Sequence, residues 1–374
     1  MKIAIVQDGL MCRAGGEQVA LCFHKAFPLA PIYTQCYQPN LTFSEFADCD
    51  IRPSWLQKFA RTDNQMKALF FPLGIWAMQS QDLREYDVVL MSSTHCAKYV
   101  KVRDDALVIN YCHTPFRLAW DPQSYAQYND SSGLKRKLFN FVVKILRQVD
   151  FEYAQRPDYF LANTEETAER ARVNYGAVHP VVIYPPVNSK NFYVGPRKEY
   201  FLVVSRLEYY KRIDLVVEAF NQLGYQLIVV GKGVQADEIK ATAKANITFL
   251  SGLSADELAD IYANCRAFIF PQHEDYGITP LEANAAGRPV IAYRAGGVLS
   301  TQIPVTDNPA KATALFFDNQ NVNDLISAVR KFEVIEDSFD PIFIRNHAEA
   351  YDEDIFINKI RSFVNEKFAQ HVER

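Results

Sequence analysis

Residues 267–293 of the chain read AFIFPQHEDYGITPLEANAAGRPVIAY, and the order of elements in this stretch decides the fold. Residues 267–270 are a short apolar run closed by a proline, the pattern of a buried strand that ends in a loop. A polar loop, a helix that opens at Thr279 and stops at Gly287, and a second strand over 290–293 are then expected. A strand, a helix and a strand in this order are typical of a parallel α/β sheet.

The start of this helix is the first candidate site. Thr279 is the predicted N-cap, Pro280 suits the first helical position, and Glu282 is placed to complete a capping box. The first turn of a helix has unpaired N–H groups and a positive potential. A phosphate placed over residues 277–279 would therefore be stabilised.

Two carboxylates, Glu274 and Glu282, flank that predicted anion site. Carboxylates do not bind phosphate, but they accept hydrogen bonds from hydroxyl groups such as those of a sugar or a ribose. A phosphate site between two hydroxyl acceptors indicates a nucleotide-sugar. Spacing alone leaves a plainer alternative open, in which Glu282 only completes the capping box and Glu274 is a solvated loop residue.

The frame EDYGITPLEANAAGRPVIA, residues 274–292, resembles the signature of retaining glycosyltransferases of family 4. That resemblance implies the GT-B architecture and a nucleotide-sugar donor. It implies that Glu274 contacts the donor sugar and Glu282 the ribose. By the same resemblance the donor site also includes Tyr276, Gly277, Ile278 and Thr279.

Composition excludes several classes of protein. The chain has 374 residues, 49% of them apolar, which is enough for two domains with separate cores. Its 40 basic and 44 acidic residues give a net charge of −4, which does not favour binding to nucleic acid. Seven cysteines without a C-x-x-C pair favour reduced thiols in the cytoplasm over a disulfide scaffold or a zinc site. The opening MKIAIVQDG is predicted to be a strand, and no apolar run reaches the roughly 18 residues of a membrane span, so a soluble or peripheral protein is expected.

The first half opens with a predicted buried strand over 2–7, the pair Gly15-Gly16 and a helix over 17–27. A strand, a glycine pair and a helix can form an anion site lined by backbone, although a tight turn is the plainer explanation. The run GGEQV resembles the first-loop glycines of the same transferase family. That resemblance implies that Gly15 and Gly16 lie near the donor diphosphate and the acceptor.

The segment YCHTPFRLAWD, residues 111–121, places His113 at the carboxyl end of a predicted strand. Open α/β sheets bind ligands at such ends, although an ordinary loop histidine fits the pattern too. The segment resembles the H-T-P-x-R…W-D run of family 4 enzymes that build bacterial polysaccharides, which implies that His113 faces the reacting sugar. Arg117, Trp120 and Asp121 match the run without an assigned role.

Two apolar stretches bear on contact with a membrane. In residues 133–147 apolar side chains fall at helical spacing beside lysines and arginines. Such a helix can lie on an anionic bilayer at about 1 kcal/mol per basic residue, and an ordinary surface helix packed on the core is the alternative. Residues 67–79 contain LFFPLGIWAM and are predicted to be one packed helix, with an apolar lip for a lipid-linked acceptor as the alternative.

The second half begins with a predicted strand over 200–204 and then reads SRLEYYKR. Arg206 and Lys211 in this connection suit a diphosphate, and a solvated charged loop is the alternative. The run resembles the family's S-R-L…K-R segment, whose two cations hold the donor phosphates. Resemblance also adds Gly231, Gly233 and Leu253 to the donor site. The glycines do not form the G-x-G-x-x-G fingerprint of a nicotinamide enzyme.

Two departures bear on the diphosphate site. Many relatives carry a glutamate soon after the glycine pair of RAGGVLS, where this chain has Leu299 and Ser300, so no contact is carried over there. The D-x-D matches at 48–50 and 352–354 follow no buried strand of a nucleotide site. No metal cofactor is therefore expected, and Arg206, Lys211 and the helix terminus would neutralise the diphosphate.

Strands and helices alternate through both halves, which predicts two Rossmann-like, doubly wound parallel sheets that face a cleft. The two prolines at 185–186 mark the predicted boundary between the domains. Residues 1–186 would form the acceptor-side domain and 187–354 the donor domain. A last helix at about 355–374 would pack back on the first domain, as is usual in the GT-B architecture.

These patterns predict a retaining, metal-independent hexosyltransferase with His113 and Glu274 as its catalytic residues. The expected reaction moves glucose from UDP-glucose to a growing, lipid-linked glycan, in the cytoplasm or at the inner face of the plasma membrane. GDP-mannose is the runner-up donor, because the H-T-P-x-R…W-D run also occurs in mannosyltransferases. A sugar-nucleotide 2-epimerase and a non-catalytic nucleotide-sugar-binding subunit are the alternatives of other classes.

Overall fold

The computed structural model describes residues 1–129 and 131–373 of the chain. The chain forms two compact units. The first unit comprises Met1–Pro185 with Asp354–Arg374, and the second comprises Pro186–Glu353. The boundaries predicted after residues 186 and 354 each lie one residue from these divisions.

The first unit is built around a seven-stranded parallel sheet with the order β3-β2-β1-β4-β5-β6-β7. Strands β4 and β5 are buried along their whole length, as parallel strands covered on both faces must be. The order reverses direction between β1 and β4, which are neighbours in the sheet. The strands are β1 (Ile3–Gln7), β2 (Ile32–Thr34), β3 (Ile51–Pro53), β4 (Val88–Ser93), β5 (Leu107–Cys112), β6 (Tyr159–Ala162) and β7 (Val181–Val182).

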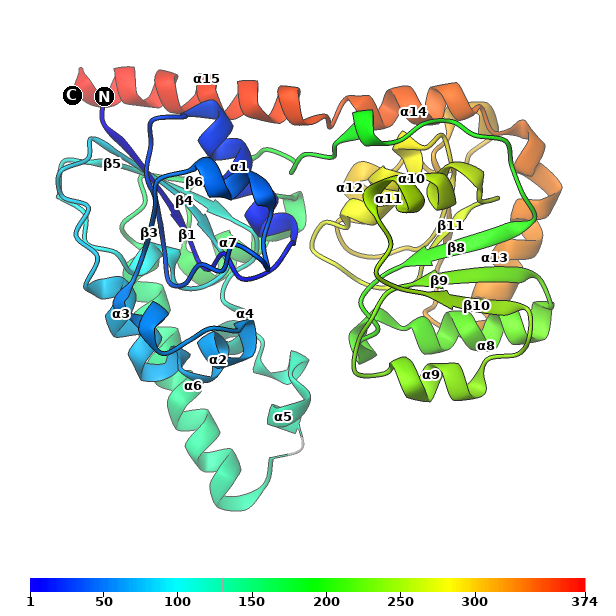
Figure 1. Ribbon diagram of the computed structural model, residues 1–374, viewed down its shortest axis with the longest axis horizontal. Helices are drawn as coiled ribbons and strands as arrows, with labels where there is room; N and C mark the ends of the chain where they lie inside the picture. Colours follow the sequence, from blue (N-terminus) through cyan, green and yellow to red (C-terminus); the bar gives the residue numbers. More distant parts are fainter. Residues whose placement is uncertain (130, 374) are drawn as a thin grey trace. The chain divides into compact units, whose positions relative to one another are not determined.

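Helices cover both faces of this sheet, and neighbouring side chains of β1 belong to opposite layers. Ile5 packs in one apolar cluster with side chains of α1 and α15, and Val6 packs in another with side chains of α3 and α6. Figure 1 shows the colour-coded order of these helices around the sheet. The helices are α1 (Gly15–Ala26), α2 (Asp63–Ala68), α3 (Ile75–Gln79), α4 (Arg117–Trp120), α5 (Ala126–Asn129), α6 (Gly133–Ala154), α7 (Glu165–Tyr175) and α15 (Glu353–Val372).

Helix α15 belongs to the first unit although it follows the second unit in the chain. The ring of Phe356 stacks on Phe23 of α1 at 6.2 Å and meets Tyr111 of β5 edge-on at 5.9 Å. Ile360 and Val364 are fully buried in the same cluster. The first core is therefore completed by residues that come after the whole second unit.

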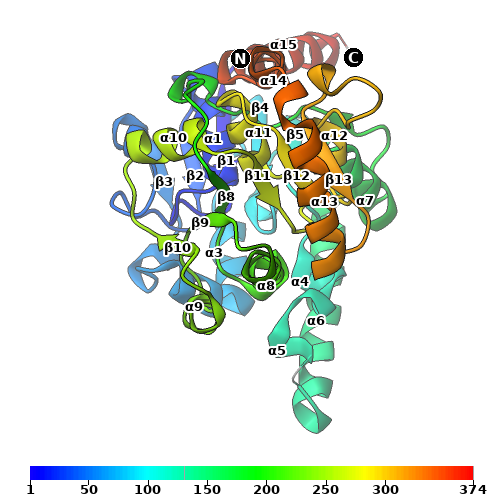
Figure 2. The same cartoon turned by 90° about the vertical axis from the view of Figure 1, so that its right-hand side faces the viewer.

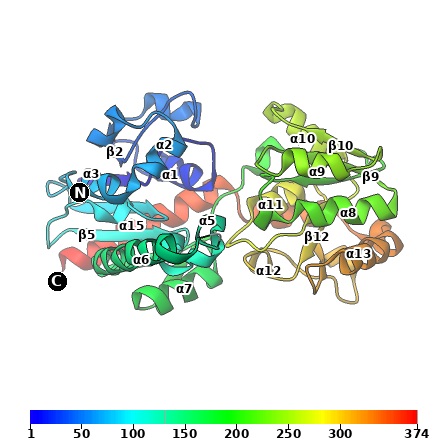
Figure 3. The same ribbon diagram turned by 90° about the horizontal axis from the view of Figure 1, so that it is seen from below.

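The second unit contains a six-stranded parallel sheet with the order β10-β9-β8-β11-β12-β13, which reverses between β8 and β11. The strands are β8 (Tyr200–Val204), β9 (Gln226–Val230), β10 (Ile247–Leu250), β11 (Phe268–Phe270), β12 (Val290–Tyr293) and β13 (Ala314–Phe317). One apolar cluster joins the sheet to α8, α9 and α13, and the other joins it to α10, α11 and α12. Figure 3 shows α8 and α13 side by side. The helices are α8 (Ile213–Leu223), α9 (Ala236–Thr242), α10 (Ala255–Asn264), α11 (Ile278–Ala285), α12 (Val298–Thr301), α13 (Val322–Ile335) and α14 (Pro341–Glu349).

The single helix predicted over residues 67–79 is wrong. Helix α2 ends at Ala68, a tight turn over Phe70–Gly74 follows, and α3 begins at Ile75. Pro72 and Gly74 explain the break, because proline cannot donate a backbone hydrogen bond and glycine is a poor helix former. Phe70 is buried in the core, whereas Trp76 is exposed.

Helix α6 divides into two halves with different surroundings. Its carboxyl-terminal half buries Val143 and Leu146 against the sheet layer, as an ordinary surface helix does. Its amino-terminal half extends past the rest of the first unit, as Figures 1 and 2 show from two directions. Leu138 and Phe141, which the helical spacing assigns to the apolar face, are exposed there. Within the described residues, no helix combines the length and the hydropathy that crossing a bilayer demands.

Candidate functional site

The predicted donor residues lie in loops at the carboxyl edge of the second sheet. Open parallel sheets bind ligands at this edge, at the point where the strand order reverses. That point lies between β8 and β11. The loops supply Arg206 and Lys211 after β8, Gly231 and Gly233 after β9, Leu253 after β10, and Glu274, Tyr276, Gly277, Ile278 and Thr279 after β11.

Lys211 and Glu274 form an ion pair across that reversal point. The Nζ of Lys211 contacts Oε1 of Glu274, and the amide of Gln272 donates to the same oxygen at 3.3 Å. Only 10% of the Lys211 side chain and 22% of the Glu274 side chain are exposed. Neither residue is the solvated loop charge of the plainer alternative.

The other cation of the β8 loop, Arg206, is exposed and donates to the hydroxyl of Tyr210. The Nζ of Lys211 lies 4.9 Å from the centre of the same ring. Tyr210 thus orients both cations, a role that the sequence does not reveal although the residue lies within the motif.

Arg212, the last residue of that motif, adopts a left-handed backbone conformation with φ of 55°. Its Nη1 donates to Oε1 of Gln320 at 3.1 Å, and Nε2 of Gln320 donates to the carbonyl of Pro271 at 2.8 Å. Gln320 therefore ties the β8 loop to the β11 loop. Strained backbone of this kind gathers at functional sites, where the surroundings hold it in place.

The predicted start of α11 is wrong by two residues. The helix begins at Ile278, its N-cap is Gly277, and no side chain caps it. Gly277 has φ of 83°, and a Cβ there would lie 2.8 Å from the ring of Phe270, so the glycine is required. Thr279 is the second residue of the helix. The unpaired N–H groups of the first turn remain at the loop that carries Glu274.

The predicted capping box at Glu282 is also absent. The hydroxyl of Tyr262 on α10 donates to Oε2 of Glu282 at 2.7 Å instead. Burial raises the pKa of the half-buried Glu282 carboxyl, and the hydrogen bond from Tyr262 lowers it in part. Tyr262 lies far from Glu282 in the chain, so no local pattern could predict the contact.

The glycines of this edge bring backbone segments into direct contact. A Cβ on Gly231 or Gly233 would overlap the backbone of Ser205 or Leu207, so these glycines allow the β9 loop to lie on the β8 loop. Gly296 pairs with Glu274, and the N–H of Gly297 donates to the Glu274 carbonyl at 2.8 Å. The glycine pair of RAGGVLS therefore holds the loop that presents Glu274.

Leu253 and Tyr276 are residues of the predicted donor site that lie partly or fully buried. Leu253 is half-buried and packs on the apolar cluster that contains Val230. Tyr276 is 6% exposed. Both residues lie at the predicted edge of the sheet.

Gly15, Gly16 and His113 form a separate group in the first unit. Helix α1 begins at Gly15, two residues before its predicted start. His113 follows β5, and its Nε2 lies 2.8 Å from Oγ of Ser92 at the end of β4. The Ser92 hydroxyl also lies 3.4 Å from the carbonyl of Gly16. The loops after β1, β4 and β5 thus meet at His113.

Trp120 has a positioning role that the sequence leaves open. Its Nε1 donates to Oδ2 of Asp150 at 2.8 Å, and the buried Lys98 lies 2.7 Å from Oδ1 of the same carboxylate. The hydroxyl of Tyr175 also donates to Asp150. This satisfied network fixes the segment after His113 onto α6. Asp121 is exposed, and the described residues assign it no role.

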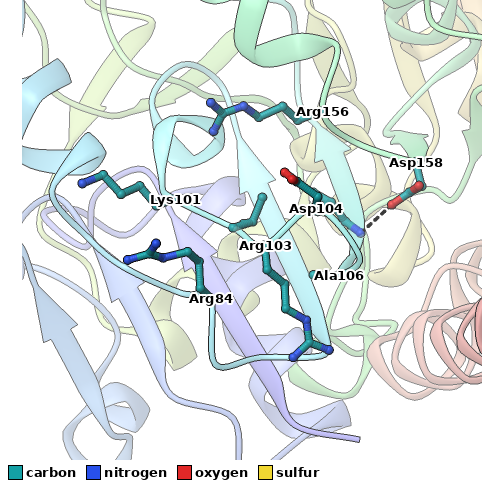
Figure 4. Close-up of a pocket in the computed structure, with 9 residues that line it drawn as sticks. Arg84, Lys101, Arg103, Asp104, Ala106, Arg156 and Asp158 are labelled. Carbon is teal, nitrogen blue, oxygen red and sulfur yellow. Dashed lines mark hydrogen bonds between the residues drawn. The ribbon is translucent and has the colours of Figure 1, made fainter.

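A cavity of about 400 Å³ lies at the opposite, amino-terminal edge of the first sheet (Figure 4). Its arginines are largely neutralised, since Arg84 pairs with Asp82 and Arg103 pairs with Asp87. In Figure 4, Asp158 accepts the Val108 N–H at 2.8 Å rather than facing a ligand. We therefore place the candidate site at the carboxyl edges and not in this cavity.

The sequence is similar to known glycosyltransferases. Residues 188–350 match the family described as Glycosyl transferases group 1. The chain is 25% identical over 323 residues to the alpha-1,3/1,6-mannosyltransferase ALG2 of Kluyveromyces lactis, a match that covers 71% of this chain and 61% of that protein. It is 22% identical over 283 residues to the O-antigen chain mannosyltransferase C of Escherichia coli, covering 67% of this chain and 75% of that protein.

Solved structures show the same fold at low identity. The crystal structure of Anabaena Alr3699/HepE in complex with UDP superposes with a TM-score of 0.72 at 14% identity, covering 98% of this chain and 100% of that one. The sucrose-phosphate synthase of Thermosynechococcus elongatus gives 0.71 at 16% identity, covering 99% of this chain and 100% of that one. Two parallel-sheet, Rossmann-like units of this kind are the GT-B fold. Residues 188–350 are therefore similar to the family described as Glycosyl transferases group 1, within a chain that has the GT-B fold.

Proposed function

We propose that this chain is a retaining glycosyltransferase that moves a hexose from a nucleoside diphosphate-sugar to a glycan. The leaving diphosphate gains negative charge in the transition state, and Lys211, Arg206 and the first-turn amides of α11 stabilise it there. Glu274 holds hydroxyls of the transferred sugar, Glu282 holds the ribose, and His113 contacts the sugar. The departing phosphate accepts the proton of the attacking hydroxyl, so no protein base is required.

The Lys211–Glu274 pair is the observation on which this proposal rests. It places a buried cation and a hydroxyl-accepting carboxylate together at the N-terminus of α11. A cation and a helix terminus suit a diphosphate, whereas a carboxylate suits the hydroxyls of the attached sugar. A free phosphate carries no sugar hydroxyls that Glu274 could bind.

The identity of the donor is the finer part of the proposal. UDP-glucose is the donor expected from the sequence. The relatives named above are mannosyltransferases, which favours GDP-mannose as the alternative. The chain spans 61% of the length of the Kluyveromyces lactis ALG2 and 62% of that of the alpha-1,3/1,6-mannosyltransferase ALG2 of Dictyostelium discoideum, so the activities of these proteins enter only as support for this choice.

We also propose that α6 docks the first unit on an anionic lipid surface, where a lipid-linked acceptor would lie. Leu134, Leu138 and Phe141 share one helix face and are 83%, 62% and 61% exposed. The exposed Lys135, Lys137 and Lys144 accompany them. Apolar side chains flanked by lysines match the charge and the polarity gradient of an anionic bilayer interface.

A donor panel tests the proposal directly. The purified chain should hydrolyse, or transfer from, UDP-glucose or GDP-mannose, and the rate should survive EDTA because protein cations neutralise the diphosphate. Product release is measured by coupled detection of free nucleoside diphosphate, with Glu274→Gln as the inactive control. Absence of turnover together with tight binding of the intact donor would instead favour the non-catalytic binding subunit. An EDTA-sensitive rate restored by magnesium or manganese would show that the diphosphate needs a metal.

A further inference from the structure

The first unit carries a second oriented charge pair, at the reversal point of its own sheet. Asp8 follows β1 and His95 follows β4, the two neighbouring strands between which the order reverses. The Nδ1 of His95 lies 3.0 Å from Oδ2 of Asp8. This pair occupies the position in the first sheet that Lys211 and Glu274 occupy in the second.

The carboxylate of Asp8 is held rigidly by backbone amides. The N–H groups of Thr94 and His95 donate to Oδ2 at 2.5 and 3.0 Å, and that of Ala97 donates to Oδ1 at 2.7 Å. Burial alone would raise the pKa of Asp8, but the charge and hydrogen bond of His95 and the amides lower it well below its usual range. Asp8 is therefore an anion that can only accept hydrogen bonds.

That carboxylate selects the tautomer of the imidazole. Because Oδ2 accepts, Nδ1 of His95 carries the proton, and in that tautomer of the neutral imidazole Nε2 is the hydrogen-bond acceptor. The rings of Phe70 and Phe116 pack against the imidazole, with centroids 5.1 and 5.7 Å away, and against each other at 5.4 Å. Phe116 belongs to the same segment as His113, so this aromatic cluster is part of the candidate site.

The Nε2 atom itself has no hydrogen-bond partner among residues 1–129 and 131–373. The side chain is 21% exposed, so this acceptor is reachable from solvent. A fixed imidazole with an open acceptor calls for a ligand that donates a hydrogen bond. Hydroxyl groups of a carbohydrate are such donors.

We propose that His95 binds a hydroxyl of the acceptor glycan through Nε2, and that Asp8 is the positioning residue that orients the ring and holds its proton at Nδ1. The proposal rests on the proposed function, since it assigns the acceptor side of that reaction. Asp8, His95 and Cys96 also lie close enough to hold one metal ion. Both oxygens of Asp8 are already bound by amides, and burial raises the pKa of the Cys96 thiol well above its usual value, so the cluster suits a hydroxyl better than a cation.

Two substitutions of similar size separate a binding role from a structural one. His95→Asn keeps a donor to Asp8 in the place of Nδ1 but has no acceptor in the place of Nε2. His95→Gln can place its carbonyl near the position of Nε2 but reaches Asp8 less well. We expect His95→Asn to raise the KM for an acceptor about tenfold, the order of one lost hydrogen bond, and His95→Gln to restore part of it. A merely structural histidine would give the reverse order.

The acceptor probes are octyl α-D-mannopyranoside and octyl β-D-glucopyranoside, each with UDP-glucose and with GDP-mannose. Asp8→Asn should raise the acceptor KM as His95→Asn does. The affinity for nucleoside diphosphate, measured by calorimetry, should stay at the wild-type value in all variants, because that site belongs to the second unit. If the acceptor KM of His95→Asn equals that of the wild type, the inference is wrong. If zinc raises the unfolding temperature of the wild type but not that of His95→Asn, His95 belongs to a metal site and not to a hydroxyl-binding site.

A binding readout covers the case in which the wild type turns over no donor. The His95 imidazole resonance, assigned by its loss in His95→Gln, should shift in wild type on titration with an octyl glycoside. A shift without turnover would keep the acceptor site and defeat the proposed reaction. Turnover without a shift for either probe would keep the reaction and defeat the acceptor site.

Discussion

At the residue scale, Lys211 and Glu274 share one ion pair but should have separable effects. Hydrogen bonds to charged groups are worth about 1.5–3 kcal/mol, so Lys211→Met should weaken nucleoside diphosphate binding about tenfold or more. Glu274→Gln removes the negative charge that pairs with the Lys211 ammonium. It should therefore leave diphosphate affinity unchanged or increase it, while turnover collapses because the sugar loses its charged hydrogen-bond acceptor.

Calorimetric titration with UDP and GDP, beside the transfer rate of each variant, checks this pair. Gln272→Ala removes only the neutral donor to Glu274 and serves as the milder control. If Glu274→Gln loses diphosphate binding as severely as Lys211→Met, the two residues do not divide the donor as proposed.

Glu282 should make the free energy of unfolding depend on pH, in addition to its proposed contact with the ribose. Burial raises its pKa above the ordinary value of 4.5, so the folded protein holds this proton more tightly than the unfolded chain. Ionisation as pH rises through the raised pKa therefore costs folding free energy. Glu282→Gln should be more stable than wild type near neutral pH, and the difference should vanish as pH falls below 4.5.

Urea unfolding of the two proteins across that pH range measures the difference. Glu282→Gln should also bind nucleoside diphosphate more weakly, because the ribose loses a carboxylate. A stability difference that is the same at both ends of the range would show that the charge of Glu282 is not the cause. Tyr262→Phe, which removes the donor to Glu282, should lower wild-type stability at neutral pH.

At the scale of elements, α6 should behave as a lipid-binding helix at its amino-terminal half only. Replacing Lys135, Lys137 and Lys144 by Glu should weaken binding to anionic liposomes by at least about a hundredfold, at about 1 kcal/mol per lysine. Arg136 is left unchanged because its guanidinium packs on Tyr128 and donates to Ser131. Co-sedimentation at low and high salt gives the measurement.

The matched charge control replaces three exposed lysines away from α6, as Lys311→Glu, Lys331→Glu and Lys359→Glu. Replacing Leu134, Leu138 and Phe141 by Ser should reduce liposome binding without removing its salt dependence. Wild type that ignores anionic liposomes at low salt rules the idea out. If the wild type self-associates and the serine variant does not, this apolar face of α6 binds a second copy of the chain.

Helix α6 and helix α11 also show how far local sequence predicts structure. The alternation of apolar runs and helical segments predicts both sheets, because parallel strands are continuous apolar stretches. The T-x-x-E pattern at Thr279 predicts a capping box, but none forms. The N-cap is Gly277, and the Glu282 carboxylate accepts a hydrogen bond from the hydroxyl of Tyr262 instead. Helical spacing places Leu138 and Leu146 on one face of α6. Leu146 is buried because the first sheet and its helices pack on that part of α6, whereas nothing comparable packs on Leu138 among the described residues.

Sequence motifs identified the loops of the site more completely than the contacts within them. Arg206, Lys211, Glu274 and Gly277 fall at the predicted edge because each motif follows a strand. Tyr210, Tyr262, Gln320 and the Asp8–His95 pair have no such signal, since their partners lie on other elements. Side-chain pairing across elements depends on the packed fold and not on local spacing.

At the scale of the whole molecule, α15 should determine the stability of the first unit alone. Phe356→Ala removes a ring that stacks on Phe23 and meets Tyr111 edge-on, and such a cavity costs about 3–5 kcal/mol. Calorimetry should show a lower unfolding temperature for the first unit and unchanged nucleoside diphosphate affinity in the second. Ile355→Ala, an exposed neighbour on the same helix, should change stability by no more than about 0.5 kcal/mol. Equal effects of the two variants would show that α15 contributes little to this core.

The return of α15 to the first unit also sets the order in which the chain can mature on the ribosome. Domains usually fold one after another as they emerge, beginning with the first. Here the second unit is fully synthesised before Phe356, Ile360 and Val364 leave the ribosome. Until then, Phe23 and Tyr111 lack the side chains that bury them in the folded protein. The unit that emerges first is the one that finishes last, and its open apolar face is a target for chaperones during that interval.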